Sequence, residues 1–144
     1  MGKGEEDKNM PKISGLDHVA IVTKDLKESL RFFETNLGLV CTHIEDLPER
    51  GIRVAMIPIG DTRIELIESQ HEKSEVAAFL QKRGPGLHHI AFRSENVASD
   101  MQALTAQGVP FTTDTPRPGA HGCQVVFAHP KGTGGVLVEL VSQP

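Results

Sequence analysis

The chain has 144 residues, a formal net charge of −4, 38% hydrophobic residues and 24% charged residues. This length predicts one globular domain with a core that needs no disulfide or metal staple. The negative charge and the lack of Trp and Tyr argue against a nucleic-acid partner. No apolar run approaches the roughly 18 residues of a membrane-spanning helix.

The first half of the chain predicts one strand, one helix and three further strands. Residues 1–12 are polar and charged, so a disordered tail without a secretory signal is expected there. The β-branched stretch 16–22 predicts a strand. Asp25 is placed to cap a helix that Gly38 ends. The remaining predicted strands cover 39–44, 52–59 and 62–67.

The second half repeats this order after a linker helix at about 74–83. A strand is expected over 87–92, and Asn96 is placed to cap a helix that Gly108 ends. Further strands are predicted over 109–113, 124–128 and 136–141. We therefore expect a single domain over 13–141, made of two modules over 13–69 and 86–141.

The two modules also repeat in their residues. A shift of 71 positions aligns His18 with His89, and a shift of 74 aligns Glu65 with Glu139. Apolar letters match easily by chance, whereas a histidine and a glutamate that match in register do not. The pattern indicates an internal duplication.

Alternation along the first strand separates its side chains into two faces. The bulkier face is expected to pack beneath the helix, which leaves His18 beside the small Ala20 on the other face. Glu65 and Glu139 each lie in the middle of an apolar strand. A buried carboxylate needs a partner, because an unpaired buried charge is costly.

A metal ion would partner all four repeated residues. Two imidazoles and two carboxylates without a thiolate suit a divalent first-row ion, and open coordination positions would admit a substrate. The predicted ligands are His18, Glu65, His89 and Glu139. Co²⁺ is the first expectation, and Mn²⁺, Ni²⁺, Zn²⁺ and Fe²⁺ are alternatives. Alternation predicts that His88 points to the opposite face, so it is not included.

Several longer motifs in the chain resemble those of a known protein family. They are LDHVAI (16–21), GDTRIELIE (60–68), FLQKRGPGLHHIAF (79–92), PRPGAHG (116–122) and HPKGTGGVLVEL (129–140). Together they resemble the vicinal oxygen chelate superfamily of glyoxalase I, and within it the methylmalonyl-CoA epimerase family. The resemblance implies an α+β fold in which two paired βαβββ modules form an open cup, in a homodimer. The ligand position that is often Gln in epimerases and Glu in glyoxalases falls on Glu65.

The resemblance also implies an activity. It is epimerisation of methylmalonyl-CoA at C2, by proton abstraction through a metal-stabilised enolate, with Glu139 as ligand and base. A second glutamate of some family members falls on Val54, so that acid is missing. Glu45, Glu49, Glu65 or water are the alternatives. Candidate contacts to the acyl-CoA are Arg53, Arg117, Lys131 and His121.

Other functions stay open at this point. A glyoxalase I-type lyase acting on a thiol adduct would use the same ligands, and a non-catalytic small-molecule-binding protein can share the fold. An extradiol dioxygenase is disfavoured by the short chain without Tyr. The expected partners are an acyl-CoA substrate and a second copy of the chain, with no nucleic acid and no membrane. Two cysteines without a disulfide or zinc pattern favour the reducing cytoplasm.

Overall fold

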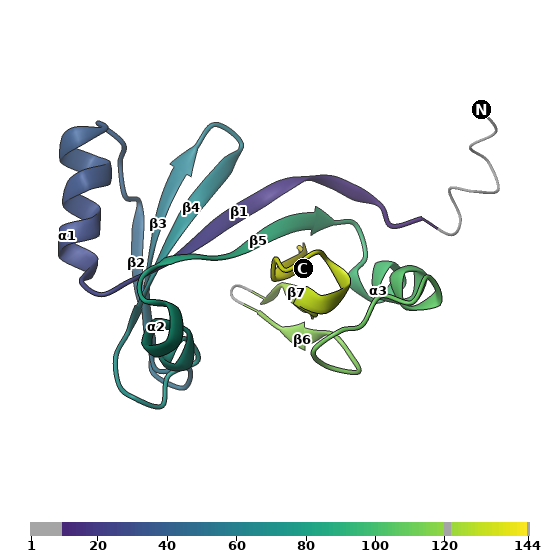
Figure 1. The fold of residues 1–144 in the computed structure, drawn as a ribbon. Helices are drawn as coiled ribbons and strands as arrows, with labels where there is room; N and C mark the ends of the chain where they lie inside the picture. Colours follow the sequence, from purple (N-terminus) through teal and green to yellow (C-terminus); the bar gives the residue numbers. More distant parts are fainter. Residues whose placement is uncertain (1–9, 120–121, 144) are drawn as a thin grey trace. The chain divides into compact units, whose positions relative to one another are not determined.

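The computed structural model describes residues 10–119 and 122–143 (Figure 1). Contacts divide the chain into two compact units, residues 18–89 and residues 1–17 with 90–144. The chain passes between them inside β1 (Ile13–Thr23) and again inside β5 (Gly86–Ser94). Most of the tail expected over 1–12 lies outside the described residues. Within the described part of the chain, no helix combines the length and apolar character needed to cross a membrane.

The unit of residues 18–89 has the strand–helix–three-strand order that the sequence predicts. Its strands lie in the order β2-β3-β4-β1. β1 and β4 run parallel and the other neighbours antiparallel. The elements after β1 are α1 (Leu26–Leu30), η2 (Arg31–Asn36), β2 (His43–Leu47), β3 (Ile52–Ile59), β4 (Thr62–Ser69) and α2 (Ala77–Arg83).

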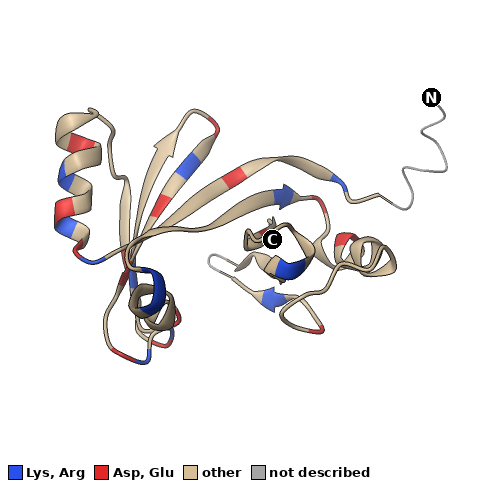
Figure 2. Ribbon diagram, viewed as in Figure 1, with Lys and Arg blue, Asp and Glu red and all other residues tan. Residues whose placement is uncertain are grey.

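The helix after β1 begins at its predicted cap. An oxygen of Asp25 accepts the backbone N–H of Glu28, which satisfies one of the free donors of the first turn. The second half of the predicted helix is wider: η2 is π-helical, and the Leu37 N–H donates to the carbonyl of Phe32, five residues back. Figure 2 shows Lys and Arg alternating with Asp and Glu along this helical segment, as expected for its solvent side.

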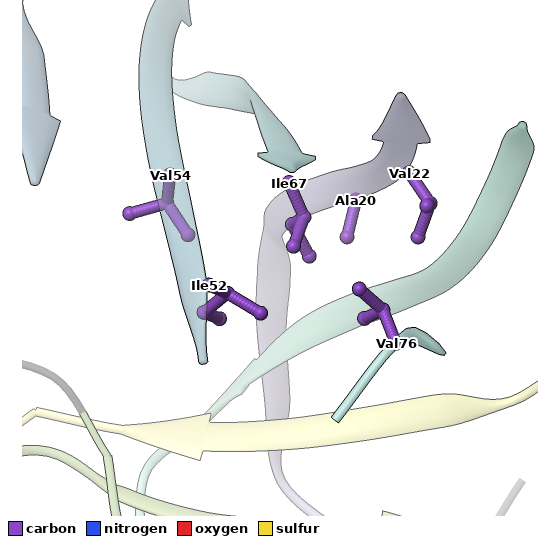
Figure 3. Packing of buried hydrophobic residues seen from close by; sticks show 6 residues of the cluster. All are labelled: Ala20, Val22, Ile52, Val54, Ile67 and Val76. Atoms are coloured by element: carbon purple, nitrogen blue, oxygen red, sulfur yellow. The ribbon is translucent and has the colours of Figure 1, made fainter. Parts of the chain in front are cut away.

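The two faces of this sheet bury different clusters. On one face, Leu26 of α1 is buried with Ala55, Ile57 and Leu66 of the sheet, and Ile21 of β1 packs against this cluster. On the other face, Ala20 and Val22 are fully buried among Ile52, Val54, Ile67 and Val76 (Figure 3). We call this second face the histidine face, because alternation along β1 places His18 on it with Ala20 and Val22. Phe79 and Leu80 of α2 pack against the same cluster.

The second unit has a matching layout. Its strands lie in the order β5-β8-β7-β6, and β5 and β8 run parallel. Asn96 caps α3 (Val97–Ala106) by accepting the Ser99 N–H. Val97 and Met101 of α3 pack on Val126 and Leu140 of the sheet. The other elements are β6 (Arg117–Pro118), β7 (Gln124–Ala128), η4 (Pro130–Gly132) and β8 (Val138–Ser142).

Two predicted strands are wrong. The strand expected over 39–44 begins only at His43, because the backbone N–H groups of Leu39 and Cys41 donate to Phe33 O and to a Glu34 carboxylate oxygen. The segment 109–113 forms only a bridge from Phe111 to Ala128, and the short β6 pairs with β7 instead. Pro110 lacks the N–H that a longer ladder would need. Both cysteines are half-buried, and neither forms a disulfide bond.

Candidate metal centre

The imidazoles of His18 and His89 meet although they are 71 positions apart in the chain. Their Nε2 atoms lie 3.3 Å apart, with the rings edge to face. Both residues are only 5% exposed. The first lies on β1 and the second on β5, within the unit of residues 18–89. Two buried ring nitrogens therefore face one another, as the repeat predicts.

Glu65 joins this pair through the register of the sheet. In the parallel pairing of β1 with β4, Ala20 lies opposite Glu65, so the carboxylate belongs to the histidine face. Its Oε2 atom lies 3.9 Å from His18 Nε2, and the side chain is 14% exposed. A carboxylate and two imidazoles thus converge within one unit.

Glu139 has the corresponding position in the second unit. In the parallel pairing of β5 with β8, Ala91 lies opposite Glu139. The neighbouring Leu140 packs under α3, so Glu139 belongs to the face of its sheet that α3 does not cover. The glutamate is 7% exposed. On both β1 and β5 the alanine two residues beyond a histidine is therefore paired with a glutamate, so the repeat extends to strand register.

His88 makes a contact that strand alternation does not predict. Its Nδ1 atom lies 2.8 Å from Nδ1 of His89, with the two ring centroids 5.1 Å apart. Its ring also packs edge to face on Phe79 of α2. The only hint in the sequence is the pair of adjacent histidines, which alternation assigns to opposite faces.

The donor set fits a divalent metal ion. Nitrogen ligands lie about 2.0–2.1 Å from zinc, so two adjacent ligands are roughly 3.0–3.4 Å apart. The 3.3 Å between the Nε2 atoms of His18 and His89 falls in this range. His18, His89 and Glu139 are all buried and each offers a metal-ligating atom. Imidazole and carboxylate ligands without thiolate suit a first-row divalent ion.

The candidate positions for a second acid have different surroundings. Val54 is 3% exposed within the apolar cluster of the histidine face. Glu45 lies directly opposite it on β2, and its carboxylate is 3.1 Å from His43 Nε2. Glu49 lies in the turn between β2 and β3. The buried surface at Val54 is therefore apolar.

The basic residues predicted to contact an acyl-CoA lie on the surface. Arg53 donates two hydrogen bonds to the Asp46 carboxylate, which lies opposite it on β2. These bonds lower the pKa of Asp46 and raise that of Arg53. Arg117 and Lys131 are exposed, and His121 lies outside the described residues.

A cavity of about 540 Å³ lies at the start of α1, away from the histidines. Arg53 and Glu68 line it, and both alternate with residues of the histidine face, so the cavity is on the opposite side of the sheet. Lys24, Lys27 and Asp46 also line it. The side chains that line the cavity carry both positive and negative charges, so the lining does not favour binding of an anion.

The chain matches a known superfamily over most of its length. The profile of the Glyoxalase/Bleomycin resistance protein/Dioxygenase superfamily matches residues 17–127. The chain therefore belongs to this superfamily, and the α+β fold class implied by the resemblance is confirmed.

Individual relatives define the family more closely. Mouse "Methylmalonyl-CoA epimerase, mitochondrial" is 34% identical over 137 residues, which cover 94% of this chain and 77% of that protein. A solved structure of a Streptomyces coelicolor methylmalonyl-CoA epimerase variant in complex with 2-nitronate-propionyl-CoA is 36% identical. Its TM-score is 0.84, with 92% of this chain and 99% of that chain covered. The uncharacterized Bacillus subtilis protein YqjC is 42% identical over 125 residues, covering 87% of this chain and 89% of that protein.

Within the superfamily, the chain belongs to the methylmalonyl-CoA epimerase family. This membership confirms the predicted resemblance and the expected enzyme class, an epimerase.

Proposed function

We propose that this protein interconverts the C2 epimers of methylmalonyl-CoA, with one divalent ion held by His18, Glu65, His89 and Glu139. The observation that carries the proposal is the 3.3 Å spacing of two buried Nε2 atoms in a chain of the epimerase family. The equivalent register of Glu65 and Glu139 supports the full ligand set.

The reaction needs a base beside C2 of the substrate. The C2–H bond breaks, its proton moves to a carboxylate oxygen, and the electron pair moves toward the thioester oxygen to give a planar enolate. We assign the base role to Glu139, because it is a buried carboxylate in a central strand. Reprotonation on the opposite side of the planar carbon inverts C2. The nitronate bound to the Streptomyces relative is likewise a planar anion.

A divalent ion, when bound, supplies Lewis-acid stabilisation for negative charge that develops on oxygen. His18 and His89 would hold it through Nε2, and the two glutamates through their carboxylates. Co²⁺ is the ion we expect first, with Mn²⁺, Ni²⁺, Zn²⁺ and Fe²⁺ accepted by the same donors.

We assign water as the donor of the proton that reaches C2 from the side opposite Glu139. Val54 presents an apolar surface, and Glu45 is engaged by His43. Glu65 lies 3.9 Å from His18 Nε2, which favours a ligand role over that of a second acid.

Proton NMR in D₂O tests the proposal. Metal-loaded protein is mixed with methylmalonyl-CoA, and loss of the C2 proton signal is followed beside a His89→Ala variant. We expect rapid exchange that the variant loses. Metal-bound protein that leaves the C2 proton in place would overturn the epimerase activity and favour a lyase acting on a thiol adduct.

A homodimer and a cytoplasmic location remain predictions of the resemblance and of the cysteine usage. Sedimentation velocity of the metal-loaded protein would check the first, with the dimer as the expected species.

A further inference from the structure

The two ring nitrogens of His89 have different neighbours. Nε2 lies 3.3 Å from Nε2 of His18, whereas Nδ1 lies 2.8 Å from Nδ1 of His88. A neutral imidazole carries one N–H and one lone pair. The partner at one nitrogen therefore decides which nitrogen keeps the lone pair.

We propose that His88 is a positioning residue, whose Nδ1 accepts the Nδ1–H of His89 and so leaves the lone pair on His89 Nε2. The inference rests on the proposed metal site. A ligating histidine nearly always donates its other ring N–H to an acceptor, which sets the tautomer and the ring orientation. Here a second imidazole takes the place of the usual carboxylate or carbonyl.

Helix α2 holds the ring of His88 in place. Phe79 packs edge to face on His88, with ring centroids 4.9 Å apart. Arg83, one turn further along α2, has its guanidinium carbon 5.8 Å from the centroid of the same Phe79 ring. These contacts restrict the rotation of His88, so its acceptor nitrogen stays directed at His89.

A purely structural role for His88 is the alternative. The half-buried ring could serve only to pack on Phe79. Two substitutions separate the roles. His88→Phe keeps an aromatic ring against Phe79 but removes the acceptor. His88→Asn removes the ring but can place an amide oxygen near the position of Nδ1.

Metal affinity of the intact chain is the first readout, measured by isothermal titration of Co²⁺ into metal-free protein. We expect His88→Phe to weaken affinity about 10–100-fold, the usual effect of losing such a partner. We expect the Co²⁺ affinity of the His88→Asn protein to remain much nearer that of the unsubstituted protein, even if its thermal midpoint is lower. Equal affinity in the His88→Phe protein, or a loss that follows thermal stability in both variants, would overturn the positioning role.

Nitrogen-15 NMR of the metal-free protein is the second readout. We expect the shifts of His89 to show Nδ1–H with a bare Nε2, and the His88→Phe protein to shift toward Nε2–H. If the unsubstituted protein shows this tautomer but binds no metal, the result would contradict the proposed function and still support the hydrogen bond between His88 and His89. Metal binding that is indifferent to the His88→Phe change would contradict the positioning role alone.

Discussion

Ala20 of β1 lies opposite Glu65 of β4 in a parallel strand pair. This register, set by packing on both faces of the sheet, carries the carboxylate to 3.9 Å from His18 Nε2. A slip of one residue would turn Glu65 to the face that α1 covers. The position of the Glu65 carboxylate therefore depends on the hydrophobic pattern of the strands around it.

We expect Glu65 to act as a metal ligand and not as a proton donor, and a pair of substitutions tests this role. Glu65→Gln keeps a ligating oxygen, so we expect bound metal and C2 exchange within about tenfold of the unsubstituted protein. Glu65→Ala removes the oxygen and should lose both. Exchange that disappears in a fully metal-loaded Glu65→Gln protein would instead assign Glu65 a proton-transfer role.

His18 should be required for metal binding. We expect His18→Ala to weaken Co²⁺ affinity at least about 100-fold, because a multidentate site loses one of its two nitrogen ligands. The control is His43→Ala, since His43 is exposed and paired with Glu45. Equilibrium dialysis followed by elemental analysis measures both. Similar metal content in the two variants would contradict the assignment.

Gly51 should be intolerant of a side chain. Its φ is +69°, and an added Cβ would lie 2.6 Å from His71 Nε2 and 3.0 Å from the Ser74 backbone. The left-handed conformation alone costs roughly 1–2 kcal/mol. Gly60→Ala is the matched control, because Gly60 has φ +59° and open space at Cβ. We expect urea denaturation to show a larger loss of unfolding free energy for Gly51→Ala than for Gly60→Ala, and an equal loss would exclude the steric contribution.

Asp46 should give a small pH-dependent contribution to stability. Hydrogen bonds from Arg53 hold its pKa below the ordinary 3.8. A carboxyl with a lowered pKa in the folded state stabilises the protein above its ordinary pKa, and this contribution disappears as pH falls through the folded value. We expect Asp46→Asn to lower the thermal midpoint slightly near neutral pH and not in strong acid. Because both groups are exposed, added salt should reduce the difference.

The two helix caps should contribute similarly to the two units. Asp25 and Asn96 each accept a backbone N–H in the first turn of their helix. Removal of such a cap costs about 0.5–2 kcal/mol. We expect Asp25→Ala and Asn96→Ala each to lower the unfolding free energy in this range, while Asp25→Asn retains most of it. Calorimetry would contradict the cap assignment if the Asn variant lost as much as the Ala variant.

Local sequence patterns predict much of the fold and a set of candidate ligands. The two helix caps are at their predicted positions, and so are the strands β3 and β7. Side-chain hydrogen bonds and alternating apolar residues act over only a few residues, so the local sequence is enough to predict them. The repeat pairs His18 with His89, and the Nε2 atoms of these two residues lie 3.3 Å apart. The strand over 39–44 was misplaced, since backbone donors of that segment bond to the preceding helix.

The residue types that recur in register can be read from the sequence, and they predict the candidate ligands, the duplication and the family. The 3.3 Å approach of the Nε2 atoms of His18 and His89, and the contact of His88 with His89, follow from the folded structure and not from the pattern. Alternation along a strand assigns each side chain to a face, but it does not set side-chain torsions. The direction of an imidazole nitrogen depends on the rings packed around it, here those of His18, His88 and Phe79.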